Sequence, residues 1–410
     1  MVTRRQYLAT TGVALSGTAV VSSATAAEYE GMVVFTYDDG PIEDYTETFQ
    51  VHQEHDAPAC SAVCPGLMED SDDFLDPKHV TEMDEFGWEF MSHTLKHRSL
   101  GHIYVERDLT EGDDRLYVDH HRHGRYSGDP VVIFDDQRKV TATTSGRGTD
   151  DYGQYIELEN PVEKSINATN GLVRHTEEFI RHILEESKSR IEEWSAPVTG
   201  FVYPFGRSDG IASDLVPEYY DSVPNFQSRN GLNPIDGLEP TRIVRKYIET
   251  DKTSLDEIDQ FMAAVERNAL GVVGGHSQYD ALPPDWIDRT LELAAEHDLR
   301  VVTMQEALSE LGVLDGNGGG NGTPGEGNGN GNASPDEGDE NKPVITHPND
   351  ADDKAENTSP GEGTRNETAN TDSEDNDKIP GFGIASGVAT TVGSMTLVKR
   401  WLDSSADEET

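Results

Sequence analysis

Short apolar runs alternate with longer amphipathic stretches between residues 32 and 311. The apolar runs predict strands at 32–35, 59–63, 88–91, 200–203, 271–275 and 300–304. The amphipathic stretches predict helices at 44–55, 79–86, 173–194, 256–268 and 285–297. Strands without polar alternation that are separated by helices are typical of a parallel sheet covered by helices. We therefore expect an α/β fold, with a distorted β/α barrel as the leading architecture and a doubly wound sheet as the alternative.

One segment interrupts this alternation. From about residue 102 to 161 the chain is rich in Tyr, Thr, Val, Gly and Asp, and it contains the turn signals SGDP and TSGRG. It shows little helical periodicity. The segment therefore predicts a small β-rich insertion in a loop of the α/β domain, and we place that domain at residues 28–314.

The first residues have the features of an export signal. Arg4 and Arg5 precede a weakly apolar stretch, and residues 24–26 read Ala-Thr-Ala, the form of a cleavage site. The arginine pair and the residues that follow it are similar to a twin-arginine signal. We therefore expect residues 1–27 to direct export, with an ordinary secretory signal or an uncleaved anchor as alternatives.

The C-terminal quarter of the chain predicts a tether. Residues 315–378 are almost without apolar side chains and carry 16 acids against 4 bases, which predicts a flexible acidic stalk. Residues 381–398 carry no charge and are followed by a basic pair, which predicts a short membrane anchor within 379–410. The Pro-Gly-Phe at 380–382 also resembles the C-terminal sorting signals of archaeal surface proteins. Both interpretations hold the exported protein at the outer face of the cell.

Charge narrows the choice of partner and environment. The chain has 78 acids against 32 bases, a formal net charge of -46. This balance argues against nucleic acid as a partner, because a phosphate backbone would be repelled. The excess of acids is not confined to the stalk, and such acidity is typical of proteins from halophiles, where molar salt screens the self-repulsion.

Candidate chemistry stands at the ends of the predicted strands. Asp38 and Asp39 close the first strand within TYDDGP, although Asp-Gly alone favours a simple turn. After the third strand, His93 and His97 are four residues apart, and on a helical turn this spacing places both imidazoles on one face. One carboxylate and two histidines form a catalytic zinc set that leaves positions open for water and substrate.

Two later strand ends add PFG at residues 204–206 and His276-Ser277. In this order, TYDDGP, SHTLKH, FVYPFG and GGHS resemble the motifs of the NodB-type polysaccharide deacetylases, also called carbohydrate esterase family four. The resemblance covers residues 33 to 311, and the β-rich insertion lies between the second and third motifs. It implies a metal-dependent hydrolase that removes acetyl groups from a polysaccharide.

The resemblance also implies a role for individual residues. Asp38 is expected to be the general base, and His276 the general acid. The backbone N–H of Phe205 is expected to help bind the oxyanion. The expected ligands of a divalent metal, with zinc the leading ion, are Asp39, His93 and His97.

Two positions depart from the family's motifs. Val202 stands where an arginine that pairs with the catalytic base is usual, and Ser277 follows His276 where an aspartate is usual. We expect an arginine from a later segment to supply the missing charge. Arg242 is the best candidate in the sequence, and Arg245 is the next.

The leading hypothesis is an exported, surface-tethered hydrolase that removes N-acetyl or O-acetyl groups from a polysaccharide. For an N-acetyl substrate it would act on a carbon–nitrogen bond other than a peptide bond. Two alternatives stay open: an inactive carbohydrate-binding surface protein on the same scaffold, and a hydrolase of a non-sugar amide or cyclic imide. The complete set of metal ligands and base favours an enzyme.

Overall fold

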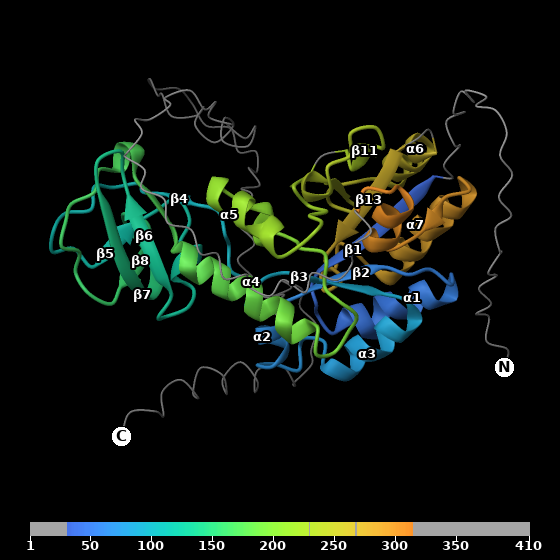
Figure 1. Ribbon diagram of the computed structural model, residues 1–410, viewed down its shortest axis with the longest axis horizontal. Helices are drawn as coiled ribbons and strands as arrows, with labels where there is room; N and C mark the ends of the chain where they lie inside the picture. The colour runs from blue at the N-terminus through green and yellow to red at the C-terminus, as the bar shows by residue number, and fades with distance from the viewer. Residues whose placement is uncertain (1–30, 229, 267–268, 315–410) are drawn as a thin grey trace, which may run out of the picture. The chain divides into compact units, whose positions relative to one another are not determined.

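The computed structural model describes residues 31–228, 230–266 and 269–314, which form an α/β domain with an added β-sheet (Figure 1). The predicted signal at 1–27, the stalk at 315–378 and the C-terminal segment at 379–410 lie outside the described residues. Within the described part of the chain, no helix has both the length and the apolar character needed to cross a membrane.

The main sheet has the strand order β10-β12-β13-β1-β2-β3, with β11 added to β13 and β14 added to β1. Its strands are β1 Met32–Asp39, β2 Cys60–Val63, β3 Glu89–Ser92, β10 Gln227–Ser228, β11 Leu232–Pro234, β12 Val244–Tyr247, β13 Ala269–Gly275 and β14 Arg300–Val301. Except for β11, the strands pair in parallel. β1 lies between β13 and β2, so its end is central to the sheet.

Backbone hydrogen bonds close this sheet into a distorted barrel. The edge strand β3 bonds to residues 200–202, and these bond to residues 221–223. Residues 223–226 in turn bond to residues 240–243, directly before β12. The ring of pairings is therefore continuous from β1 through β3 and back through β12 and β13. The predicted β/α barrel is confirmed, and the open doubly wound sheet does not describe these residues.

Alternate side chains of β1 face the inside and the outside of this barrel. Met32 and Val34 belong to the inner apolar cluster, whereas Val33 and Phe35 belong to the cluster beneath the helices. Because side chains alternate along a strand, Asp38 continues the inward series. The strand thus turns from apolar to acidic at the end where the barrel opens.

Helices cover the outside of the barrel and close its other end. They are α1 Phe49–Glu54, α2 Pro65–Met68, α3 Pro77–Phe86, α4 Glu177–Ile191, α5 Gly210–Leu215, α6 Leu255–Val265, α7 Pro284–Glu296 and α8 Met304–Glu310. Met304 and Leu308 of α8 share the inner cluster with Met32 at the start of β1. The barrel is therefore filled with apolar side chains on the side away from Asp38.

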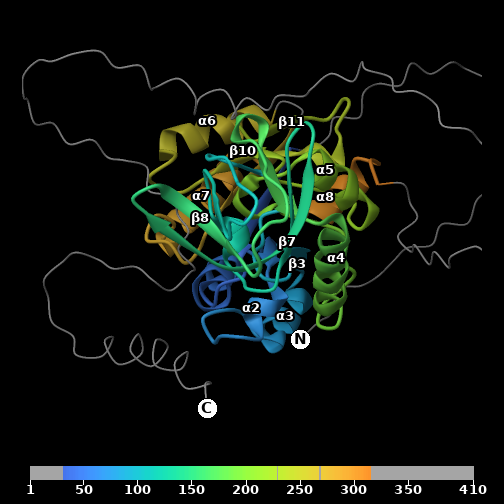
Figure 2. The same ribbon diagram turned by 90° about the vertical axis from the view of Figure 1, so that its left-hand side faces the viewer.

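A second, antiparallel sheet lies where the sequence predicts the β-rich insertion, and in Figure 2 its strands β7 and β8 lie toward the viewer. Its strands, in the order β4-β9-β6-β7-β8-β5, are β4 Ile103–Tyr104, β5 Arg115–Tyr117, β6 Pro130–Phe134, β7 Lys139–Asp150, β8 Gly153–Leu158 and β9 Leu172–His175. The sheet extends past residue 161 because β9 pairs between β4 and β6. The helix expected from residue 173 accordingly begins at Glu177, where the Thr176 hydroxyl caps the first turn.

Candidate active site

Strained backbone marks three of the motifs at the open end of the barrel. Asp39, Thr94, His97 and Phe205 have φ angles of 78°, 61°, 54° and 61°. Residues other than glycine rarely adopt this left-handed region. Such strain persists only where the surrounding structure holds it in place, and it concentrates at functional sites. The surrounding structure therefore holds the backbone of the first three motifs, TYDDGP, SHTLKH and FVYPFG, in a strained conformation at this end of the barrel.

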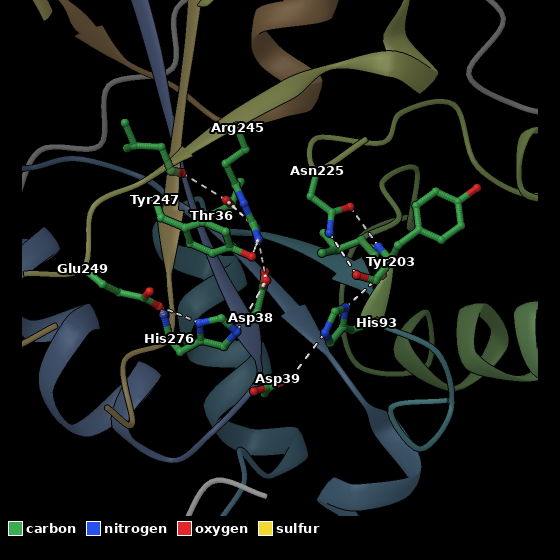
Figure 3. Close-up of polar contacts among 12 residues, drawn as sticks. Thr36, Asp38, Asp39, His93, Tyr203, Asn225, Arg245, Tyr247, Glu249 and His276 are labelled. Carbon is green, nitrogen blue, oxygen red and sulfur yellow. Dashed lines mark hydrogen bonds and ion pairs between the residues drawn. The ribbon is translucent and has the colours of Figure 1, made fainter. Parts of the chain in front are cut away.

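The two histidines meet, but they do not lie on a helix. Residues 94–96 form a tight turn, with positive φ at Thr94 and His97, whereas the sequence predicted a helical turn. The turn brings the ring centres of His93 and His97 to 4.8 Å. Their Nε2 atoms lie 3.4 Å and 3.2 Å from Oδ1 of Asp39 (Figure 3 shows His93 and Asp39). The positive φ angles of Thr94 and His97, rather than a helical repeat, orient both imidazole rings toward Asp39.

This group fits a divalent metal. One ligand atom from each of Asp39, His93 and His97 lies within 4.8 Å of the others. Oδ1 of Asp39 is buried and has no hydrogen-bond partner among the described residues. Burial lowers the pKa of His97 to about 3, so its imidazole is neutral and has a lone pair to offer. A carboxylate and two imidazoles are the donor types that suit zinc and leave coordination positions open.

The tautomer of His93 follows from its second contact. Its Nδ1 lies 2.8 Å from the carbonyl oxygen of Val202. Because a carbonyl only accepts, Nδ1 carries the proton and the Nε2 lone pair faces Asp39. Metal-binding histidines are typically oriented by a hydrogen bond of this kind. The backbone of the third motif thus orients His93, a candidate metal ligand from the second motif.

Asp38 forms a buried ion pair inside the barrel. Nη1 and Nη2 of Arg245, on β12, lie 2.8 Å and 2.6 Å from its two carboxylate oxygens (Figure 3). Glycine at 274 leaves room for this side chain, because a Cβ there would lie 2.7 Å from Cδ of Arg245. Burial acts to raise the pKa of Asp38, but the charge and hydrogen bonds of Arg245 outweigh it and lower the pKa. Asp38 is therefore an ionised carboxylate with a fixed orientation.

Arg245, rather than Arg242, supplies the missing arginine, so the preference for Arg242 was wrong. Arg242 is 48% exposed, and its Nε lies 3.4 Å from a carboxylate oxygen of Glu239. It ends a short turn before β12, whereas Arg245 lies within the strand and points into the barrel. Val202 meanwhile fills part of the inner apolar cluster. Which arginine faces inward depends on where the strand begins, and the motifs do not contain that information.

His276 follows β13 and faces Asp38. Its Nε2 lies 3.9 Å from Oδ2 of Asp38, and its Nδ1 lies 2.6 Å from Oε1 of Glu249. Burial acts to lower the pKa of His276, but the hydrogen bond to Glu249 and the nearby carboxylates raise it to about 9. The imidazole is therefore protonated at neutral pH. A carboxylate and an imidazolium thus stand opposite each other beside the three ligands.

The sequence analysis missed Glu249 and Tyr247. Arg245, Tyr247 and Glu249 alternate in RKYIE, and this period of two places all three on one face of the strand and its extension. The hydroxyl of Tyr247 lies 3.2 Å from Nη2 of Arg245, and its ring stacks on His276 at 6.0 Å between centres. The alternation of polar residues in RKYIE was the available signal. It had no counterpart among the motifs.

Ser277 has a structural reason to be serine. Its hydroxyl donates to Oδ1 of Asp44 at 2.6 Å, and the hydroxyl of Ser61 donates to Oδ2 at 2.6 Å. Asp44 begins a π-helical turn that follows the first motif, and burial raises the pKa of Asp44 to about 7. A carboxylate therefore already occupies the place next to residue 277, and a second one there would be repelled.

Phe205 lies beside the ligand set, and its loop is held rigidly. Its ring centre lies 4.5 Å from that of His97. Tyr203, two residues before Phe205, is held by Asn225. The Asn225 side chain accepts a hydrogen bond from the backbone N–H of Tyr203 and donates one to its carbonyl oxygen, both at 2.9 Å (Figure 3). The backbone of Phe205 is thereby kept close to the site, and its part in binding an oxyanion stays a prediction.

Comparison with known families agrees with the first two motifs. The family model described as polysaccharide deacetylase matches residues 26–116, which include Asp38, Asp39, His93 and His97. The third and last motifs lie beyond the matched residues. A search of curated protein sequences found no significant match.

Solved structures of deacetylases and esterases resemble the protein weakly. One is the carbohydrate esterase family four domain of a multidomain xylanase from the hindgut metagenome of Trinervitermes trinervoides, at 12% identity and a TM-score of 0.39, covering 69% of this chain and 92% of that chain. Another is a family four carbohydrate esterase from Streptomyces lividans in complex with acetate, at 11% identity and a TM-score of 0.37, covering 67% and 94%. These values are too low to assign a function.

Proposed function

We propose that the protein is a metal-dependent hydrolase that removes acetyl groups from a polysaccharide. One observation carries the proposal: three metal-type ligands converge beside an ionised carboxylate and a protonated imidazole that face each other. The match to the polysaccharide deacetylase family model over residues 26–116 supports the same reaction class.

Asp39, His93 and His97 would hold the divalent ion, with zinc the expected metal. When bound, such an ion lowers the pKa of a coordinated water toward ~7 and polarises a carbonyl oxygen. The three side chains leave open positions for both water and substrate.

The remaining residues of the site move protons and stabilise charge. Asp38 accepts the proton of the attacking water, and the ion pair with Arg245 keeps its carboxylate ionised and oriented. The backbone N–H of Phe205 donates to the oxygen on which negative charge develops. The imidazolium of His276 gives its proton to the departing amine or hydroxyl of the sugar. Acetate and a free amino or hydroxyl group are the products.

We also propose that the protein acts outside the cell on a polysaccharide at or near the surface. The support is the export-signal pattern at residues 1–27 and the apolar segment within 379–410. A C-terminal tether suits a polymeric substrate that is itself fixed to the cell surface. Recovery of the full-length protein only from washed culture supernatant would contradict this proposal.

The test is acetate release from a panel of acetylated oligosaccharides by protein prepared in high salt with zinc. Asp38→Asn should retain stoichiometric metal and lose turnover by roughly 10²–10⁴-fold, because the proton acceptor is removed while the three metal-type ligands stay in place. Asp39→Ala and His97→Ala should lose metal and turnover together.

Two outcomes would overturn the proposal. Bound metal without acetate release from any glycan would favour a non-sugar amide as substrate. Absence of both metal and release would favour a carbohydrate-binding protein. Metal loss in Asp38→Asn would reverse the roles of the two adjacent carboxylates.

A further inference from the structure

A loop of the inserted β-rich segment, between β5 and β6, lies against two motifs of the candidate site. A short turn between β5 and β6, Arg122–Gly124, places the guanidinium carbon of Arg122 4.3 Å from the ring centre of Phe205. Two residues past this turn, the hydroxyl of Tyr126 donates to the carbonyl oxygen of Lys96 at 3.0 Å. Residues of the insertion thus contact both the second and the third motif.

Arg125, on the same segment, lies against Nδ1 of His97, an expected metal ligand. Its Nη1 is 3.5 Å from Nδ1 of His97. If Nε2 of His97 is to offer its lone pair toward Asp39, the neutral ring must carry its proton on Nδ1. The guanidinium also has only donors, so two donors then face each other. The other tautomer would let Nδ1 accept from Arg125, but it leaves no lone pair on Nε2.

The Nδ1 atoms of His93 and His97 have different kinds of partner. The Nδ1 proton of His93 goes to a carbonyl oxygen, which is the usual kind of partner for a metal-binding histidine. For Nδ1 of His97, the contact found among the described residues is the donor Arg125. An acceptor placed between them would satisfy both groups. A negatively charged oxygen would do so best, because charge-assisted hydrogen bonds are the stronger ones.

The local charges favour such an anion. Arg125 is half-buried, and among the described residues its guanidinium contacts Nδ1 of His97 and the ring of Tyr126 rather than a carboxylate. The acids on neighbouring segments already have partners: Asp129 accepts two hydrogen bonds from Arg98, at 2.6 Å and 2.9 Å, and Asp70 pairs with Lys96 at 2.6 Å. The chain has a net charge of -46, yet in the part that the structure describes no acid is paired with this arginine beside an expected metal ligand.

We propose that the substrate is an anionic polysaccharide, and that Arg125 binds a carboxylate or sulfate on or next to the acetylated sugar. The inference rests on the proposed function, because it names the class of its substrate. A guanidinium fork matches the two oxygens of a carboxylate or sulfate. The positive charge of Arg125 would also offset the repulsion between an acidic polymer and this acidic protein.

The experiment measures binding rather than turnover. Zinc-loaded Asp38→Asn protein is titrated calorimetrically, at one fixed ionic strength, with an oligosaccharide that alternates glucuronate and N-acetylglucosamine, and with its carboxyl-reduced neutral derivative. We expect the acidic oligosaccharide to bind about tenfold or more tightly, the effect of one charge-assisted contact. Adding Arg125→Gln should remove about tenfold of this preference and leave the zinc content unchanged.

Arg115→Gln is the matched control. Arg115 lies on β5 of the same insertion and pairs with Asp150 and Glu157, so its loss removes an equal charge away from the site. The preference should survive in this variant. A sulfated, uronate-free oligosaccharide forms the third arm, and binding to it alone would assign sulfate rather than carboxylate as the recognised group.

Three results would overturn the inference. They are equal affinity for acidic and neutral oligosaccharides, a preference that survives Arg125→Gln, and a preference lost equally in Arg115→Gln. These results are distinct from a failure of the proposed function. Selective binding without acetate release by wild-type protein would reject the deacetylase and keep the anion site, whereas equal release from acidic and neutral glycans would do the reverse.

Discussion

The contact between Arg245 and Asp38 serves the chemistry more than the fold. Both side chains are buried, and the desolvation of two charges is only offset by their mutual attraction. Such a pair adds little net stability, but removing one partner leaves an uncompensated buried charge. The pair keeps the Asp38 carboxylate ionised and oriented beside the three proposed metal ligands.

Arg245→Gln is therefore expected to lose roughly 3–5 kcal/mol of unfolding free energy, because Asp38 would stay buried without its partner. Acetate release should fall as well. Arg242→Gln is the matched control, and it should change stability by no more than about 0.5 kcal/mol, since its side chain is exposed. Urea denaturation and acetate release check both variants, and equal effects would contradict the assignment of Arg245.

Glu249 sets the protonation of His276. With the pKa of His276 raised to about 9, activity that needs the imidazolium should persist at neutral pH and fall as pH rises through about 9. Glu249→Gln removes a negative charge, so this alkaline limb should move to lower pH. The pH profile of kcat/KM is the measurement, and an alkaline limb identical in both proteins would contradict the role of Glu249.

The same shift has a consequence for stability. A histidine whose pKa rises from 6.5 to about 9 on folding contributes stability that is complete below 6.5 and is lost as pH rises through about 9. The stability deficit of Glu249→Gln should therefore be largest near and below neutral pH and should shrink in alkaline solution. Denaturation at several pH values tests this sign.

At the scale of elements, the site depends on connections between strand ends. β12 supplies Arg245 and the residues directly after it supply Glu249, so one segment holds both Asp38, the proposed base, and His276, the proposed acid. The π-helical turn after β1 carries Asp44, which accepts from Ser61 of β2 and from Ser277 after β13. This buried carboxylate joins three segments, and it explains why serine follows His276.

Ser277→Asp would restore the residue usual in the resembled family, yet it should destabilise this protein. It places a second carboxylate against Asp44, whose pKa burial has already raised to about 7. When two carboxyl groups are adjacent, the charge of one disfavours ionisation of the other. We expect a loss of roughly 1–3 kcal/mol in urea denaturation, larger at pH 8 than at pH 6. Asp44→Asn in the same chain should recover much of it, and a Ser277→Asp protein as stable as wild type at pH 8 would refute this account.

At the scale of the whole molecule, the net charge of -46 opposes compaction. The Debye length grows from ~3 Å at 1 M salt to ~30 Å at 0.01 M, so the repulsion spreads as salt is removed. We expect the melting temperature to fall and the circular dichroism signal to weaken after dialysis to ~10 mM salt, and both to recover when salt is restored. No change in either quantity would rule out dependence on salt.

The fold class, and which polar residues gather where the strands of the sheet end, could be predicted from the sequence alone. Apolar runs in alternation with amphipathic helices report burial on both faces of a sheet, and this is a local property of the chain. Asp38, Asp39, His93 and His97 each stand within a residue or a short turn of a strand end. Parallel strands bring those ends together, so the convergence of these residues followed from their positions.

Which distant side chains complete the site became clear from the three-dimensional arrangement of the strands and loops. Arg245 and Arg242 differ by three residues, and a strand boundary together with the closure of the barrel directs one inward and leaves the other exposed. Glu249 meets His276 across 27 residues, and Arg125 reaches His97 from an inserted sheet. These contacts arise because long-range pairing orients each strand and loop. The order of apolar and polar residues along the chain indicates which residues are buried. Contact between remote side chains depends instead on how the whole barrel closes.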